Sequence, residues 1–228
     1  MTTVEPLAAV GRSSSSFDVT AFQDEAAVMA QNMCPTWCRT TMTGVTITPR
    51  SSHSATVLNG RLYIIGGYGG EPRKHDVQSN IFSIDMAAQT LEVTEEAPLD
   101  KAEKRMGHAA LPVFNNIYTH GGWNGKKYLD HGALYDVDSE FILQEKHKGR
   151  VMPEARRDHT MTLCGRTLVL FGGFGNGQQY NDVWTLDVLK WKWKEQLLEN
   201  APCPRRGHST TRIGKKLFVF GGMYGYSK

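Results

Sequence analysis

The stretch RRDHTMTLCGRTLVLFGG, residues 156–173, decides the fold because its pattern occurs four times in the chain. Each copy reads Arg-x-x-His followed by two adjacent glycines, and the first glycine always lies 13 positions after the histidine. Successive histidines are 55, 51 and 49 positions apart. A fixed period of about 50 residues indicates a repeat architecture in which each copy is one structural unit. The motif residues are Arg50, His53, Gly66, Gly67, Arg105, His108, Gly121, Gly122, Arg156, His159, Gly172, Gly173, Arg205, His208, Gly221 and Gly222.

Each copy predicts a hairpin after the histidine. Two apolar runs are separated by a dipeptide containing Gly or Asn, which accepts the positive φ angles of a tight turn. The second run is apolar at consecutive positions, as in LVLFGG, which indicates a strand covered on both faces. A third strand that ends in Asp and a fourth strand complete the unit. The turns are expected at 59–60, 115–116, 165–166 and 214–215, and the third strands at 81–85, 133–136 and 182–187.

On these residues the chain resembles the kelch-repeat β-propeller family, and the resemblance implies an all-β fold of four-stranded blades. Kelch blades usually place Trp in the fourth strand. Here Trp191 or Trp193 fills that place in the third copy, whereas Leu91 and Phe141 stand in the first two. The aromatic position is therefore only partly kept.

The number of strands indicates an incomplete propeller. Residues 36–43 are expected to form an orphan outer strand, the fourth strand of a blade whose other strands do not precede it. We therefore expect residues 34–228 to form a kelch-type segment with about three complete blades plus part of a fourth, after a short, partly helical extension at 1–33. Exposed strand edges favour self-association, or completion of the propeller by another chain or by further sequence.

Composition excludes several classes of partner. The net charge is +3 and no basic stretch stands alone, so no nucleic acid is expected as a ligand. No apolar run reaches membrane-spanning length, and the first residues lack the pattern of a signal peptide. Four cysteines in a chain of 228 residues form neither a zinc-finger spacing nor a dense disulfide framework. These features favour a cytoplasmic protein, with cytoskeletal or ciliary association compatible with them.

The repeated Arg and His residues are interpreted as scaffold, because a residue present in every blade serves what every blade needs. No metal, cofactor or catalytic site is expected from them. The iron motif Glu-x-x-x-Asp-x-x-x-His of the plant specifier proteins that this fold resembles fails here, since Glu154 and Asp158 are followed by Thr162. Nothing marks a Cys–Tyr pair of the galactose oxidase type. An enzyme with a galactose oxidase-like or sugar epimerase-like site on the propeller axis remains the alternative.

The preferred hypothesis is a non-enzymatic scaffold that binds a protein partner. Loops between strands two and three vary among the copies, and they emerge on the same face as the links between blades. Their aromatic and charged residues are typical of interface hot spots. We expect the partner to contact Tyr68, Arg73, Trp123, Lys127 and Tyr180.

Overall fold

The computed structural model describes residues 40–71, 73–88, 90–96, 103–144 and 151–225. The predicted partly helical extension at 1–33 and its boundary at residue 34 lie outside these residues. The chain divides into two units, Met1–Thr40 and Thr41–Lys228, and the second contains almost everything described. No helix occurs among the described residues, so that part of the chain contains no helix that could span a membrane.

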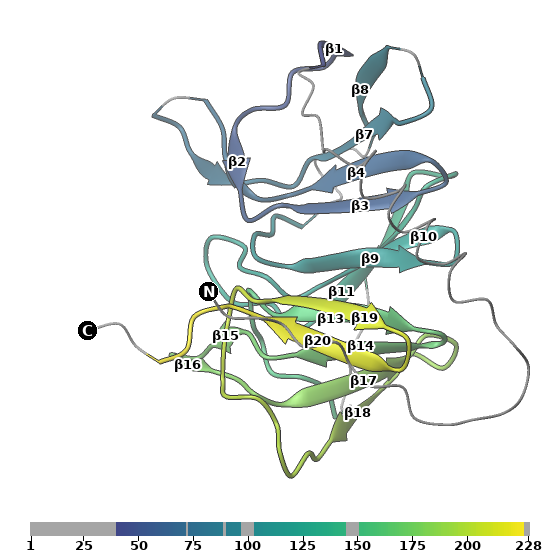
Figure 1. The fold of residues 1–228 in the computed structure, drawn as a ribbon. Helices are drawn as coiled ribbons and strands as arrows, with labels where there is room; N and C mark the ends of the chain where they lie inside the picture. The colour runs from purple at the N-terminus through teal and green to yellow at the C-terminus, as the bar shows by residue number, and fades with distance from the viewer. Residues whose placement is uncertain (1–39, 72, 89, 97–102, 145–150, 226–228) are drawn as a thin grey trace, which may run out of the picture. The chain divides into compact units, whose positions relative to one another are not determined.

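Three sheets correspond to the first three copies of the repeat, and each contains four antiparallel strands in chain order (Figure 1). Blade 1 contains β3 (Ser54–Leu58), β4 (Arg61–Ile65), β7 (Ile81–Asp85) and β8 (Leu91–Glu95). Blade 2 contains β9 (Ala109–Val113), β10 (Asn116–His120), β11 (Gly132–Asp136) and β12 (Phe141–Gln144). Blade 3 contains β13 (Thr160–Cys164), β14 (Thr167–Phe171), β17 (Val183–Asp187) and β18 (Lys192–Gln196). Blade 4 is represented by the hairpin of β19 (Ser209–Ile213) and β20 (Lys216–Phe220). The predicted all-β, partial propeller is confirmed.

The first strands of successive blades lie against one another, β3 beside β9, β9 beside β13, and β13 beside β19. Buried apolar side chains fill the junctions between blades. Tyr63 and Ile65 of blade 1 meet Ile117 and Tyr135 of blade 2. The larger core of blades 2 and 3 contains Leu111, Val113, Tyr118, Leu168, Leu170, Trp184, Leu186, Val188 and Trp193.

The aspartates that end the third strands cap the turns that follow, as predicted. Asp85 accepts a hydrogen bond from the amide of Ala87 at 2.9 Å, and Asp187 accepts two from Leu189 and Lys190. One turn differs from the expectation. β9 ends at Val113, so the turn of blade 2 lies one residue earlier than predicted and places Phe114 at φ 55.

The predicted orphan strand at 36–43 needs correction. Of its described residues 40–43, only Met42 and Thr43 belong to a strand, β1 (Met42–Gly44), which pairs in parallel with β8 of blade 1 and does not extend blade 4. β8 has a free outer edge, and Gly44 permits close approach to it, because a Cβ there would lie 2.3 Å from the Val93 carbonyl oxygen. Blade 4 has no described third strand beside which a fourth could lie.

The repeated arginines hold the glycine turns. In every copy the Arg Nη1 donates to the carbonyl oxygen of the first glycine, at 2.9 or 3.0 Å. Arg105 and Arg156 are buried, so their guanidinium groups satisfy carbonyls that water does not reach. In Arg156 a bidentate ion pair with Asp182, at 2.6 and 2.7 Å, adds to this contact.

Candidate functional site

One face of the propeller segment is built by short strands that join the links to the loops between strands two and three. β2 (Arg50–Ser51), in the link before blade 1, pairs with β5 (Tyr68–Gly69), which pairs with β6 (Asp76–Val77). Single bridges repeat this arrangement in the next blades, at Met106 with Trp123 and at Arg157 with Phe174. In blade 3, β15 (Phe174–Gly175) pairs with β16 (Gln178–Gln179). Links and loops therefore share the predicted face, which we call the loop face.

A groove of about 430 Å³ lies on the loop face between blades 1 and 2 and the start of blade 3. It is an open surface groove, unlike the enclosed and mostly apolar pockets that bury small molecules. Its lining residues come from two loops and two links: Tyr68, Asp76, Val77, Met106, Trp123, Gly125, Tyr128 and Arg157.

Aromatic side chains form the walls of the groove. Trp123 and Tyr128 pack edge to face with their ring centroids 4.7 Å apart, and Phe174 lies 6.0 Å beyond Tyr128. Tyr68, across the groove, is 42% exposed and packs edge to face against His75. Rings already held by edge-to-face packing lose little conformational entropy on binding, so the groove offers preformed apolar surface.

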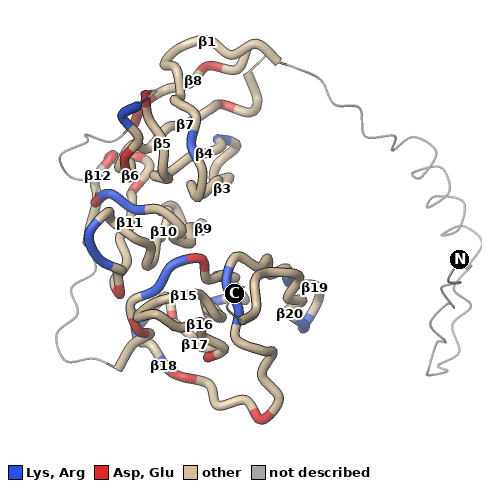
Figure 2. The backbone as a smooth tube through the Cα atoms, turned by 90° about the vertical axis from the view of Figure 1, so that its left-hand side faces the viewer, with Lys and Arg blue, Asp and Glu red and all other residues tan. Residues whose placement is uncertain are grey.

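The groove also contains charges of both signs. A hydrogen bond from Lys104 and a second from the amide of Val77 hold the pKa of the Asp76 carboxyl below its usual range. Arg157 Nε lies 3.5 Å from the Asp158 carboxylate and has no hydrogen-bond partner among the described residues. Figure 2 looks onto the loop face and shows basic and acidic segments interspersed around β5, β6 and β15. The groove therefore combines a carboxylate that already pairs with Lys104 and a partly buried guanidinium that lies beside Asp158.

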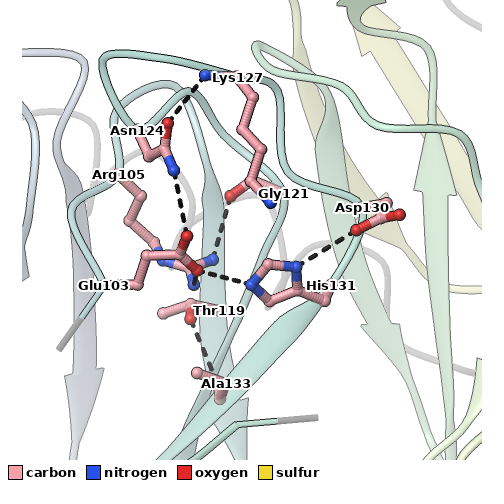
Figure 3. Close-up of polar contacts among 9 residues, drawn as sticks. All are labelled: Glu103, Arg105, Thr119, Gly121, Asn124, Lys127, Asp130, His131 and Ala133. Atoms are coloured by element: carbon pink, nitrogen blue, oxygen red, sulfur yellow. Dashed lines mark hydrogen bonds and ion pairs between the residues drawn. The ribbon is translucent and has the colours of Figure 1, made fainter. Parts of the chain in front are cut away.

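A polar network below the groove fixes the loop that carries Trp123 (Figure 3). Glu103, in the link, accepts a hydrogen bond from Asn124 at 3.2 Å and pairs with His131 Nε2 at 2.6 Å. Asn124 in turn accepts the amide of Lys127 at 2.9 Å. Because these contacts join the two ends of the loop to the link, they define its conformation. We call Glu103, Asn124 and His131 the loop clamp.

The loop clamp shifts the titration of both its ionisable members. The hydrogen bond with Glu103 raises the pKa of His131, and burial only partly opposes this. The same hydrogen bond lowers the pKa of Glu103. Burial lowers the pKa of neighbouring Arg105, whose ion pair with Glu103 spans 3.6 Å. Opposite charges therefore stabilise each other at the base of the loop.

A smaller cavity next to the clamp has a volume of about 30 Å³ and is lined in part by Glu103, Arg105 and Tyr135. This volume holds about one water molecule. It is too small for an organic substrate. In the part of the chain that the structure describes, no group of three or more His, Cys, Asp or Glu side chains could hold a metal ion.

The structure brings together two of the five residues expected to bind a partner. Tyr68 and Trp123 line the groove, while Arg73 and Lys127 are exposed on the same loops outside its lining. The expectation for Tyr180 is corrected. Its side chain is 8% exposed, because its ring lies under the Arg156 guanidinium at 4.1 Å and its hydroxyl donates to Glu154 at 2.7 Å.

Sequence reasoning missed Met106 and Arg157 of the groove. Both directly follow a motif arginine. The residues at this position are Ser51, Met106, Arg157 and Arg206, so the residue type varies among the first three copies and is the same in the last two. A variable position inside a constant motif was the signal that could have found them.

Comparisons with known proteins agree with the repeat pattern. The family model described as the KLHDC2/KLHL20/DRC7 Kelch-repeats domain matches residues 68–228. Kelch domain-containing protein 3 of Rattus norvegicus is 29% identical over 200 residues, which cover 82% of this chain and 51% of that protein. The chain thus spans about half the length of this relative.

Two other relatives are of different kinds. The dynein alpha chain of the flagellar outer arm of Chlamydomonas reinhardtii is 30% identical over 169 residues, 71% of this chain and 4% of that protein. Acyl-CoA-binding domain-containing protein 4 of Arabidopsis thaliana is 26% identical over 185 residues, 80% of this chain and 27% of that protein. The matched region is therefore a module that occurs in otherwise dissimilar proteins.

Proposed function

The chain belongs to the kelch-repeat family, and from this premise we propose that it is a non-enzymatic scaffold that binds a protein partner in the groove of the loop face. The groove itself carries the proposal. Its lining residues change from copy to copy while the blade scaffold repeats, and Trp, Tyr and Arg are the residue types that dominate interface energetics. The occurrence of similar modules in unlike proteins also supports a binding role over a shared chemical reaction.

The chemistry of the groove suggests the kind of segment that it binds. A side chain inserted between Tyr68 and Trp123 would be apolar or aromatic, since both of these lining residues are aromatic. A basic neighbour would compete with Lys104 for Asp76, and an acidic or carbonyl group would accept from the accessible part of the Arg157 guanidinium. We propose that Arg73 and Lys127 contact the partner at the rim. The protein would act in the cytoplasm, where a cytoskeletal or ciliary role would agree with the dynein relative.

Replacing Trp123 and Tyr68 by Ala tests the groove. Loss of a central interface aromatic costs about 2 kcal/mol or more of binding, roughly a 30-fold loss of affinity. We expect quantitative pull-down of the partner to fall accordingly, with a thermal melt close to that of the parent. Phe114→Asn is the control, because Phe114 is 66% exposed at a turn outside the groove, and Asn59 occupies the equivalent place in blade 1.

Full partner recovery by both groove variants, in proteins that melt like the parent, would contradict the proposal.

The alternative, a galactose oxidase-like or sugar epimerase-like enzyme, calls for a separate measurement. Stoichiometric copper or iron in purified protein would support an oxidase or another metal-dependent enzyme.

A further inference from the structure

The loops between strands two and three of blades 1 and 2 lie side by side along the groove. Gly125 of the blade 2 loop is so close to β6 that a Cβ there would lie 3.8 Å from Val77 Cγ2 and 4.0 Å from Asp76 Oδ1. All three residues line the groove, together with Tyr68 and Trp123. The charged residues that the two loops carry at their turns therefore flank the same aromatic surface.

Each of these loops carries two adjacent basic residues at its turn. The amide of Lys74 donates to the Glu71 carbonyl oxygen at 2.9 Å in the blade 1 loop. In the blade 2 loop, the amides of Lys126 and Lys127 donate to Asn124 Oδ1 at 3.0 and 2.9 Å. These bonds hold the backbone of both turns, while the basic side chains are exposed. We call these residues the basic rim: Arg73, Lys74, Lys126 and Lys127.

The charge of the basic rim is not neutralised within the part of the chain that the structure describes. No side chain of the rim forms an ion pair there, although Glu71 adds one exposed carboxylate to the blade 1 loop. The other acidic residues beside the groove already have cationic partners, which are Lys104 for Asp76, His131 for Glu103 and Asp130, and Arg157 for Asp158. Unpaired positive charge therefore exceeds unpaired negative charge around the groove.

This distribution of charge discriminates between partners. Complementary charges at the edge of an interface accelerate association, and like charges suppress the binding of wrong partners. A basic segment would meet the four cations of the rim and find Asp76 already paired with Lys104. An acidic segment would be attracted from both sides of the groove, and an apolar residue within it would reach the aromatic walls.

We propose that the groove and its basic rim recognise an acidic segment of a protein partner, in which Asp and Glu residues flank one apolar or aromatic anchor. The inference rests on the proposed function, because it names the class of partner for the same groove. In this arrangement the anchor contacts Tyr68 and Trp123. The flanking carboxylates pair with the basic rim.

Three short synthetic peptides with the same central Phe measure the preference. In the first peptide the Phe is flanked by Asp and Glu, in the second by Asn and Gln, and in the third by Lys and Arg. Fluorescence polarisation with residues 1–228 gives the affinity of each. We expect the acidic peptide to bind at least tenfold more tightly than the neutral one, and the basic peptide to bind least. The difference should shrink as NaCl is added, because salt screens exposed charges.

Charge reversal in the blade 2 loop tests the rim directly. The double variant Lys126→Glu, Lys127→Glu should slow the association of the acidic peptide at least tenfold and change its dissociation rate little. The matched control is Lys192→Glu, Lys194→Glu, which changes the net charge equally at exposed positions of β18 outside the groove lining. It should bind like the parent. Trp123→Ala should instead accelerate dissociation, because it removes a contact of the anchor.

The possible outcomes separate the two proposals. Equal binding of all three peptides, lost in Trp123→Ala, would retain the groove as a binding site and overturn its preference for acidic segments. Equal effects of the two charge-reversal variants would overturn that preference too, as would a short oligothymidylate that binds as tightly as the acidic peptide. If none of the peptides binds, the acidic-segment inference fails, whereas pull-down with the Tyr68 and Trp123 variants still decides the proposed function.

Discussion

At the scale of the residue, the motif histidines share a position but not a partner. At the junctions between blades, each motif histidine faces the residue that follows the histidine of the preceding blade. His108 and His208 find a hydroxyl there, whereas His159 faces the position of Ala109. Neither ring nitrogen of His159 has a hydrogen-bond partner among the described residues, and burial lowers its pKa to about 3. The regular sequence pattern predicted the same role for every motif histidine. It did not show this difference, because the hydrogen-bond partner lies in another copy of the repeat.

Ala109→Ser should therefore stabilise the protein. Ala109 pairs with His120 as Ser54 pairs with Ile65, so a hydroxyl there would point at His159 as Ser54 points at His108. A new hydrogen bond to a buried group contributes about 0.5–1.5 kcal/mol. Ser54→Ala is the mirror experiment and should lose a comparable amount. Urea denaturation measures both, and a destabilised Ala109→Ser protein would contradict the expected equivalence of the two positions.

At the scale of the element, hairpins, glycine pairs and the aspartates of the third strands could be predicted, because each depends on residues close in sequence. The strand with which β1 pairs could not be predicted, since an outer strand pairs with whichever sheet edge is free. The groove was found only in part for a similar reason. Tyr68 and Trp123 stood out in variable loops, but Tyr180 is drawn inward by Arg156 and Glu154, which no pattern of exposure in the sequence reveals.

The loop clamp predicts a pH dependence of stability. His131 has a pKa raised above 6.5 by Glu103 and Asp130, so its stabilising contribution is present below pH 6.5 and is lost as the pH rises through the raised value. Glu103 has a pKa lowered below 4.5, so its contribution is present above pH 4.5 and is lost as the pH falls through the lowered value. The clamp is therefore strongest between these two pH values.

The difference in unfolding free energy between the parent and His131→Gln isolates this effect, because buried histidines elsewhere titrate in both proteins. We expect the difference to be largest between pH 4.5 and 6.5 and to shrink on either side. A difference that stays constant from well below pH 4.5 to well above pH 6.5 would show that the pair is not ionised, as would an NMR titration placing the pKa of His131 at or below its ordinary value.

At the scale of the whole molecule, the sequence predicted three blades and part of a fourth because the period of the motif fixes their number. The coupling between blades was not predictable, since it depends on how closely one backbone approaches the next. In repeat proteins stability is about the sum of the units and of the contacts between neighbours. The glycine at each junction is where this contact can be tested.

Gly172 and Gly165 form a matched pair for this test. Both have φ 66, so alanine at either position adopts the same unfavourable backbone conformation. They differ in their surroundings, because a Cβ at Gly172 would lie 2.8 Å from the Arg205 carbonyl oxygen of blade 4, whereas nothing lies within 4 Å at Gly165. The left-handed conformation costs about 1–2 kcal/mol in both variants.

The free energy of unfolding of Gly172→Ala should be lower than that of Gly165→Ala by about 1–3 kcal/mol. This is the usual cost of forcing extra atoms into a packed site. Urea denaturation of both proteins gives the difference, with unchanged slopes showing that the same surface unfolds. If the blades behave as one cooperative unit, the extra loss appears in the transition of the whole segment, because separating blade 4 from blade 3 breaks contacts such as that between the Phe171 and His208 rings. Equal midpoints for the two variants would show that the backbone contact between the third and fourth blades contributes nothing to stability, and that each blade is held by its own sheet alone.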